Sequence, residues 1–144
     1  MFRHDGTVAV VDFGSVKAFG PGLCERVLKS WHAIIQGDAE QVITHYCSLG
    51  IGRGDRRLVK KLYRAHLAPL DEWMRLPYQE DVFDFGKHAD YCAQGAKLYR
   101  DTVRREVMNG FTPETLLFDR NVYGLYRLFT ELKARVRLKN QWIF

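Results

Sequence analysis

The sequence predicts a mainly α-helical protein, in which a short N-terminal β-hairpin is followed by about five helices. The 144 residues are 47% hydrophobic and 13% aromatic, which is enough for one packed domain over residues 1–144. From residue 21 onward, apolar residues recur three or four positions apart, the spacing of one helix face. Residues 8–11, by contrast, form a continuous apolar run of the kind that predicts a strand covered on both faces.

The predicted hairpin ends at the triplet Asp12-Phe13-Gly14, and an Asp-Gly turn at residues 5–6 precedes its apolar strand. A rigid strand fixes the position of a carboxylate at its end, and a following glycine lets the backbone turn away sharply. Strand, carboxylate and glycine in this order suit a metal site on the phosphate side of a ligand, so Asp12 is a candidate metal ligand and Phe13 and Gly14 would form its turn. An ordinary aspartate at the end of a strand has the same pattern, so these residues alone leave both interpretations open.

A second copy of the triplet, Asp84-Phe85-Gly86, lies in a different context. Acidic residues surround it, and no apolar run precedes it. We expect a solvated loop before a helix whose N-cap is either Asp84 or Gly86.

The first two helices are predicted to meet at a short joint. The first begins near Pro21 and stops at Gly37, and Asp38 with Gln41 resembles a capping box that starts the second. The predicted inward faces are Leu23, Val27, Trp31, Ile34 and Ile35, then Val42, Tyr46 and Leu49.

Three more helices are predicted after the glycine-rich connector at residues 50–54. Asp55 caps a third helix, which Pro69 should kink or end. The segment 71–84 is either a packed irregular segment or a recognition surface. A fourth helix spans about residues 87–108, and the last begins near Pro113. The inward faces predicted for the third and last helices are Val59, Leu62, Tyr63, His66, Leu67 and Leu70, then Val122, Leu125, Phe129, Leu132 and Val136.

The charge and the cysteine content indicate which binding partners and which cellular compartment to expect. The net charge is +5, and the basic residues are densest at 53–64 and 133–139. They form either solvated helix faces or a contact with an acidic membrane surface, whereas nucleic acid is disfavoured because no binding motif accompanies the charge. No apolar run reaches the roughly 18 residues of a membrane span, and three cysteines without a C-x-x-C pair are typical of a reducing compartment. We expect an intracellular protein that is cytoplasmic or peripherally membrane-bound.

Several of these segments together resemble a known family. In protein kinases the aspartate of such a triplet holds Mg²⁺ against the nucleotide phosphates. Residues 6–14, the helix that follows, Gly37-Asp38, a second helix and Leu49-Gly50 are similar to the C-terminal half of the UbiB/AarF/ADCK family of atypical kinases. Phe118-Asp119-Arg120 and residues 124–128 resemble the closing helix of that family.

This resemblance implies the C-terminal lobe of a protein-kinase-like fold, Mg²⁺-dependent ATP binding and a role in ubiquinone or other isoprenoid-quinone lipid metabolism. Carried over residue by residue, it assigns only Asp12 to the catalytic site, as the Mg²⁺ ligand, so no complete catalytic set is expected. The nucleotide loop, the strand lysine and the catalytic-loop Asp and Asn of the family do not occur in these 144 residues. A separate N-terminal kinase lobe is therefore the expected partner, and this chain alone should bind neither Mg²⁺ nor ATP tightly.

Two hypotheses of different classes remain for the chain. In the first it is the C-terminal piece of an ATP-dependent kinase or ATPase. In the second it is a catalytically inactive, stand-alone helical module that binds a protein or a membrane. In either case the apolar strand lacks a pairing partner, so residues 1–14 should mediate self-association or be disordered.

Overall fold

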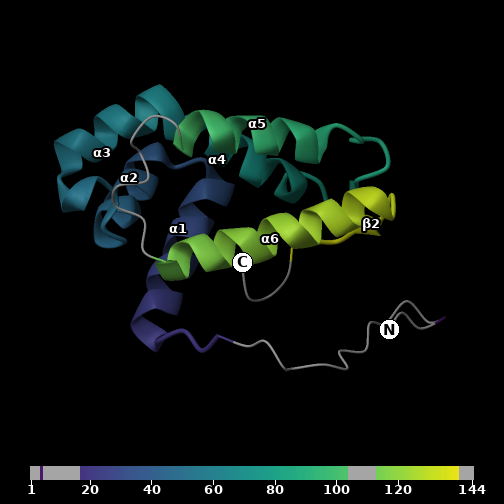
Figure 1. The fold of residues 1–144 in the computed structure, drawn as a ribbon, viewed down its shortest axis with the longest axis horizontal. Coiled ribbons are helices and arrows are strands. Elements are labelled where there is room, and N and C mark those ends of the chain that lie inside the picture. The colour runs from purple at the N-terminus through teal and green to yellow at the C-terminus, as the bar shows by residue number, and fades with distance from the viewer. Residues whose placement is uncertain (1–3, 5–16, 104–112, 140–144) are drawn as a thin grey trace.

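The computed structural model describes residue 4, residues 17–103 and residues 113–139, and over these ranges the fold is mainly helical (Figure 1). Six α-helices dominate: α1 (Pro21–Gln36), α2 (Ala39–Ser48), α3 (Arg56–Leu62), α4 (Ala68–Arg75), α5 (Tyr91–Val103) and α6 (Pro113–Glu131). The two strands, β1 (Phe83–Asp84) and β2 (Arg135–Val136), pair antiparallel with Phe83 opposite Val136. The predicted mainly α fold is thus confirmed. The predicted N-terminal hairpin lies outside the described residues.

The joint between α1 and α2 forms as predicted. Gly37 adopts a left-handed conformation (φ 73°), and its N–H and that of Asp38 bond to the carbonyls of Ile34 and Ala33. The Asp38 side chain then accepts a hydrogen bond from the Gln41 backbone N–H at 3.0 Å, which caps α2. These local signals turn the chain sharply, so α1 and α2 pack against each other.

The third predicted helix is longer than expected and changes its winding. The short 3₁₀ turn η1 (Ile51–Gly54) leads to Asp55, whose side chain caps α3 as predicted. A π-helical turn, η2 (Tyr63–Leu67), comes next and runs directly into α4. Pro69 neither ends nor breaks the helix, because the π turn just before it accommodates the missing N–H and the bulky ring.

The π turn also decides which residue of α4 faces the core. A uniform α-helix from Val59 would point Leu70 inward, as the sequence pattern predicts. One extra residue in a turn rotates the rest of the helix by about 100° relative to that pattern. Asp71 is accordingly buried, with 3% of its surface exposed, while Leu70 is only half-buried.

The segment 71–84 proves to be packed structure. It contains the second half of α4, the 3₁₀ turn η3 (Leu76–Tyr78) and strand β1. The expectation of a solvated loop at the second triplet is wrong, because Phe85 is fully buried and a strand does precede the turn. Asp84 accepts hydrogen bonds from the backbone N–H groups of Gly86 and Lys87. It therefore closes a local turn, and the next helix starts only at Tyr91.

Helix α6 presents the predicted face only in part: Val122 and Phe129 pack against the buried core, as does Val136 beyond the helix, whereas the two predicted leucines do not. Leu125 and Leu132 are 46% and 52% exposed, whereas Tyr126 is 2% exposed. Burial at Thr115 and Tyr126, with Val122 half-buried between them, sets the inward stripe a fraction of a turn away from the leucines. Because Thr115 and Tyr126 carry hydroxyl groups, a pattern based on aliphatic residues did not identify them as buried positions.

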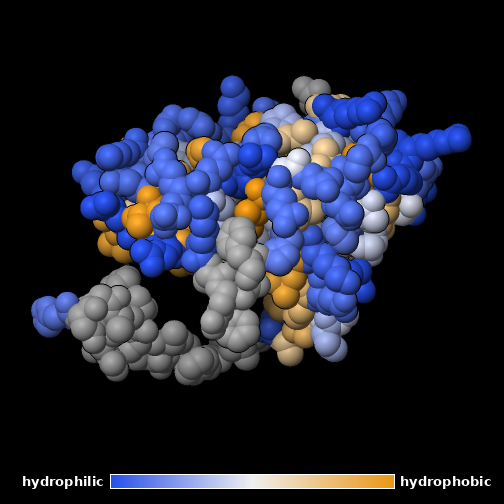
Figure 2. Space-filling model, turned by 180° about the vertical axis from the view of Figure 1, so that it is seen from behind, coloured by the Kyte–Doolittle hydropathy of each residue, from blue (hydrophilic) through white to orange (hydrophobic). Residues whose placement is uncertain are grey.

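Two apolar clusters form the interior. The first lies under α1, α2 and α3, and the second lies between α4, β1, α5 and α6. Helix α4 joins them, since its Met74 packs against the first cluster while its Trp73 packs against the second. Figure 2 shows that the face seen from behind is mostly hydrophilic, with hydrophobic residues reaching the surface in separate patches. Among the described helices, none is both long and apolar enough to cross a membrane.

Candidate functional site

The site residues predicted from the sequence, Asp12, Phe13 and Gly14, lie outside the described residues, so the Mg²⁺ assignment stays a prediction. Within the ranges that the structure describes, no group of three or more His, Cys, Asp or Glu side chains is placed to hold a metal ion. Two other features carry functional chemistry: a cavity between three helices and a basic helix face.

The cavity lies between α4, α5 and α6 and encloses about 550 Å³, a volume typical of small-molecule sites. α5 and α6 run side by side in opposite directions along it (Figure 1). The lining is predominantly apolar and aromatic, with one acidic and two basic side chains: Leu70, Trp73, Met74, Gly95, Ala96, Tyr99, Arg100, Leu116, Asp119, Arg120, Val122 and Tyr123.

The aromatic wall is held in place by hydrogen bonds and by a glycine. Trp73 stacks on Tyr91 with ring centroids 4.7 Å apart. The Trp73 indole N–H donates to the Tyr91 carbonyl at 2.8 Å, and the Tyr91 hydroxyl donates to the Trp73 carbonyl at 3.0 Å. A Cβ on Gly95 would lie 2.2 Å from the indole ring, so only glycine lets Trp73 lie this close to α5. The ring centroid of Tyr123 lies 6.3 Å from that of Trp73, and its hydroxyl donates to the Cys92 carbonyl at 3.1 Å.

Two acidic side chains at the cavity influence each other electrostatically. Asp119 lines it, and burial raises the pKa of this carboxyl to about 7. Asp71 lies deeper, where burial and the neighbouring charges of Asp119 and Glu72 raise its pKa to about 8 despite a hydrogen bond from Tyr46. The Tyr46 hydroxyl donates to Asp71 Oδ1 at 2.5 Å, while the second oxygen, Oδ2, is buried with no partner in the described chain.

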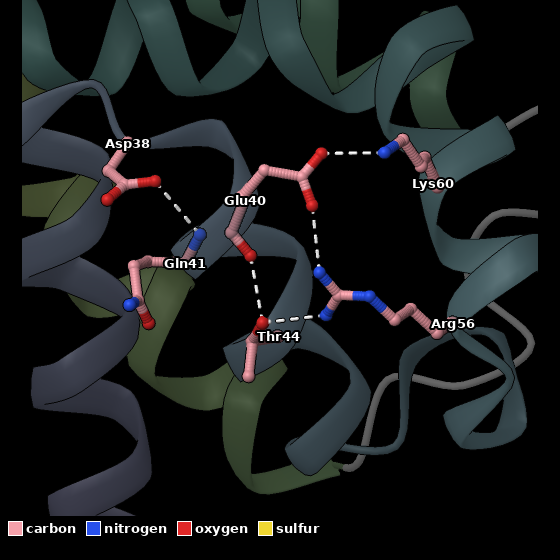
Figure 3. Close-up of polar contacts among 6 residues, drawn as sticks. All are labelled: Asp38, Glu40, Gln41, Thr44, Arg56 and Lys60. Atoms are coloured by element: carbon pink, nitrogen blue, oxygen red, sulfur yellow. Dashed lines mark hydrogen bonds and ion pairs between the residues drawn. The ribbon is translucent and has the colours of Figure 1, made fainter.

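The second feature is the exposed side of α3. Glu40 on α2 accepts from Lys60 at 2.6 Å and from Arg56 at 2.8 Å, and Arg56 also donates to Thr44 (Figure 3). These two cations are therefore paired. Their neighbours Arg57, Lys61 and Arg64 are exposed and line a shallow depression in the surface. Within the described ranges, none of the three forms an ion pair.

In comparisons with protein-family models, curated proteins and solved structures, nothing matches this chain. The case for a function therefore rests on the residues and geometry of this chain.

Sequence patterns alone did not find the cavity, although one signal was present. Asp119 falls on the same helix stripe as Thr115, Val122 and Tyr126, so an acid sits where a core residue is expected. An acidic residue on an inward stripe indicates either a buried hydrogen-bond network or a ligand site. Asp71 gave no such signal, because the π turn shifts its helix phase.

Proposed function

We propose that the chain is the C-terminal part of a UbiB-like atypical kinase or ATPase, acting in ubiquinone or other isoprenoid-quinone lipid metabolism. The observation that carries the proposal is the sequence order around Asp12: a continuous apolar run at residues 8–11, the carboxylate of Asp12, Gly14, and then a helical body. The left-handed Gly37 and the Asp38 cap lie where the resembling sequences have their Gly-Asp joint, which supports the proposal. Residues 118–128 lie within the single helix α6, in line with a closing helix.

In this proposal Asp12 would hold Mg²⁺ through a carboxylate oxygen, whose negative charge would offset part of the positive charge of the metal beside the ATP phosphates. Mg²⁺ in turn would neutralise the charge that develops on the transferred phosphoryl group. One carboxylate is not sufficient, because phosphoryl transfer depends on several positioned groups. The remaining groups would come from an N-terminal kinase lobe.

The test compares Asp12→Asn with Asp84→Asn in the chain joined to such a lobe. Asn has nearly the size of Asp but no charge, so Asp12→Asn should abolish Mg²⁺-dependent nucleotide binding and ATP turnover. Asp84→Asn is the matched control, because its amide oxygen can still accept from Gly86 and Lys87 and close the same turn. Equal activity of wild type and Asp12→Asn would refute the proposal, and a loss confined to Asp84→Asn would move the site to the second triplet.

A second function, contact with an anionic membrane surface, is favoured by three cations of α3 and η2 that form no ion pair within the described ranges. Arg57, Lys61 and Arg64 recur at helical spacing and face the same side, and each basic group near an anionic surface contributes about 1 kcal/mol. Such a contact suits either the kinase proposal or a stand-alone helical module.

Sedimentation with vesicles tests this second function. Replacing Arg57, Lys61 and Arg64 by Gln should abolish binding to vesicles containing phosphatidylserine, with no binding to phosphatidylcholine in either case. Replacing Arg26, Lys97 and Arg127 by Gln removes the same amount of charge from exposed residues of other helices, away from the depression, and should leave binding largely intact. If both variants lose binding equally, the contact depends on net charge alone and the proposed surface is wrong.

A further inference from the structure

The cavity between α4, α5 and α6 is lined by one carboxyl group, that of Asp119, which has no partner among the described residues. The indole N–H of Trp73 and the hydroxyl of Tyr123 both donate to backbone carbonyls. Asp119, in contrast, is half-buried in the cavity wall and makes no hydrogen bond or ion pair with the described parts of the chain. A carboxylate partly withdrawn from water is stabilised by a partner, so Asp119 favours an incoming donor or cation.

The arginines of the cavity do not fill this role. Arg100 and Arg120 are exposed, which places their guanidinium groups at the rim in contact with water. Neither reaches Asp119 within ion-pair distance among the contacts of the described residues. A charge in direct contact with a buried carboxylate interacts about four times more strongly than one across water, taking effective dielectric constants of about 20 and 80. The carboxylate therefore dominates the inner end of the cavity.

We propose that this cavity binds a small organic amine with an apolar body, with Asp119 as the counter-ion of the ammonium group. Trp73, Tyr99 and Tyr123 would enclose the apolar part, and their aromatic faces favour a cation. A ligand bearing a carboxylate would instead bring its charge toward Asp119. The proposal stands independently of the kinase-like function.

Binding should depend on pH because both partners titrate. The groups that face Asp119 are Asp71 on α4, Tyr46 on α2 and Tyr99 on α5, together with the rim guanidinium groups. Since the pKa of Asp119 is about 7, its carboxylate forms as pH rises from 6 to 8. Amine affinity should rise over this range and fall again above about pH 10, where an alkylammonium loses its proton.

The probes are n-octylamine, n-octanol and n-octanoate, titrated calorimetrically into the full chain at pH 8. These molecules share chain length and differ in charge. We expect saturable binding of octylamine at a single site, and affinities at least tenfold weaker for octanol and octanoate. At pH 6.5, octylamine binding should release a proton, detected as a dependence of the heat on the ionisation enthalpy of the buffer.

Variants separate the charge from the cavity. Asp119→Asn should lower octylamine affinity at least tenfold and remove the proton release. Arg120→Gln should change octylamine affinity by less than about twofold. Ala96→Phe fills the cavity from α5 without touching the carboxyl and should abolish binding, which keeps the test decisive if Asp119→Asn unfolds. Octanoate binding as tightly as octylamine, or octylamine affinity that survives both Asp119→Asn and Ala96→Phe, would overturn the proposal.

Discussion

Asp71 is the residue whose environment departs most from that of a solvated side chain. It is buried on α4, its Oδ1 accepts from the Tyr46 hydroxyl, and its pKa is raised to about 8. At neutral pH it is therefore mainly protonated. The folded state favours the neutral form, so the stability that this group contributes is complete below its unfolded pKa of 3.8 and is lost as pH rises through about 8.

Asp71→Asn should flatten the pH dependence of stability. The amide oxygen can still accept from Tyr46, whereas the variant cannot ionise. The wild-type free energy of unfolding should fall between pH 5 and pH 8.5, and the variant should lose less over the same range, since only Asp119 still titrates with a raised pKa of about 7. Urea unfolding at four pH values measures this. Asp81→Asn, at an exposed side chain, should keep the wild-type slope, and an equally steep slope for Asp71→Asn would contradict the assignment.

Two glycines in helices offer a matched pair of alanine substitutions. Gly95→Ala should destabilise the protein by about 1–3 kcal/mol, because the new Cβ would lie 2.2 Å from the Trp73 indole, which cannot move without losing its stacking and its hydrogen bond. Gly124→Ala meets open space on α6 and should stabilise it by up to about 1 kcal/mol through helix propensity. Thermal unfolding of both variants provides the comparison. Similar changes in melting temperature for Gly95→Ala and Gly124→Ala would mean that Trp73 is not held against α5.

At the scale of elements, α6 allows a direct test of which face is buried. Tyr126 packs against Phe85 and Tyr91 and bonds to the Tyr78 hydroxyl, so Tyr126→Ala should cost about 3–5 kcal/mol. Leu125→Ala, one residue earlier but 46% exposed, should cost less than about 1 kcal/mol. Denaturant titration of the two variants distinguishes the observed face from the one expected from the leucine pattern, which would reverse the order.

The elements also show why some of the fold was predictable and some was not. The joint between α1 and α2 depends on Gly37 and Asp38 themselves, so local sequence predicted it. The packing of Phe85 depends on a strand pair that joins residues 83–84 to 135–136, and no local signal reveals such a distant partner. The cavity is assembled from three helices, and its buried acids are visible only once α4 and α6 are placed together.

At the scale of the whole molecule, the kinase-like hypothesis predicts how this chain behaves by itself. Mg²⁺ with ATP should leave its melting temperature unchanged, because Asp12 would be the only contributor to the nucleotide site and one carboxylate does not hold the metal. Differential scanning fluorimetry with Mg²⁺-ATP, Mg²⁺ alone and ATP alone measures this. A rise of several degrees that disappears in Asp12→Asn would show that the chain holds a more complete site than we infer.

The π turn at Tyr63–Leu67 has a consequence for chain length. It stores one more residue than an α-helical turn would need, so a single-residue deletion there could restore regular winding without breaking the helix. That shortening would leave Asp71 buried and Trp73 against Gly95, because the deleted residue is the one that the π turn absorbs. Among related chains, a gap of one position in this stretch would therefore be compatible with the same buried acid and cavity, whereas regular α winding without a gap would bring Leu70 to the place of Asp71.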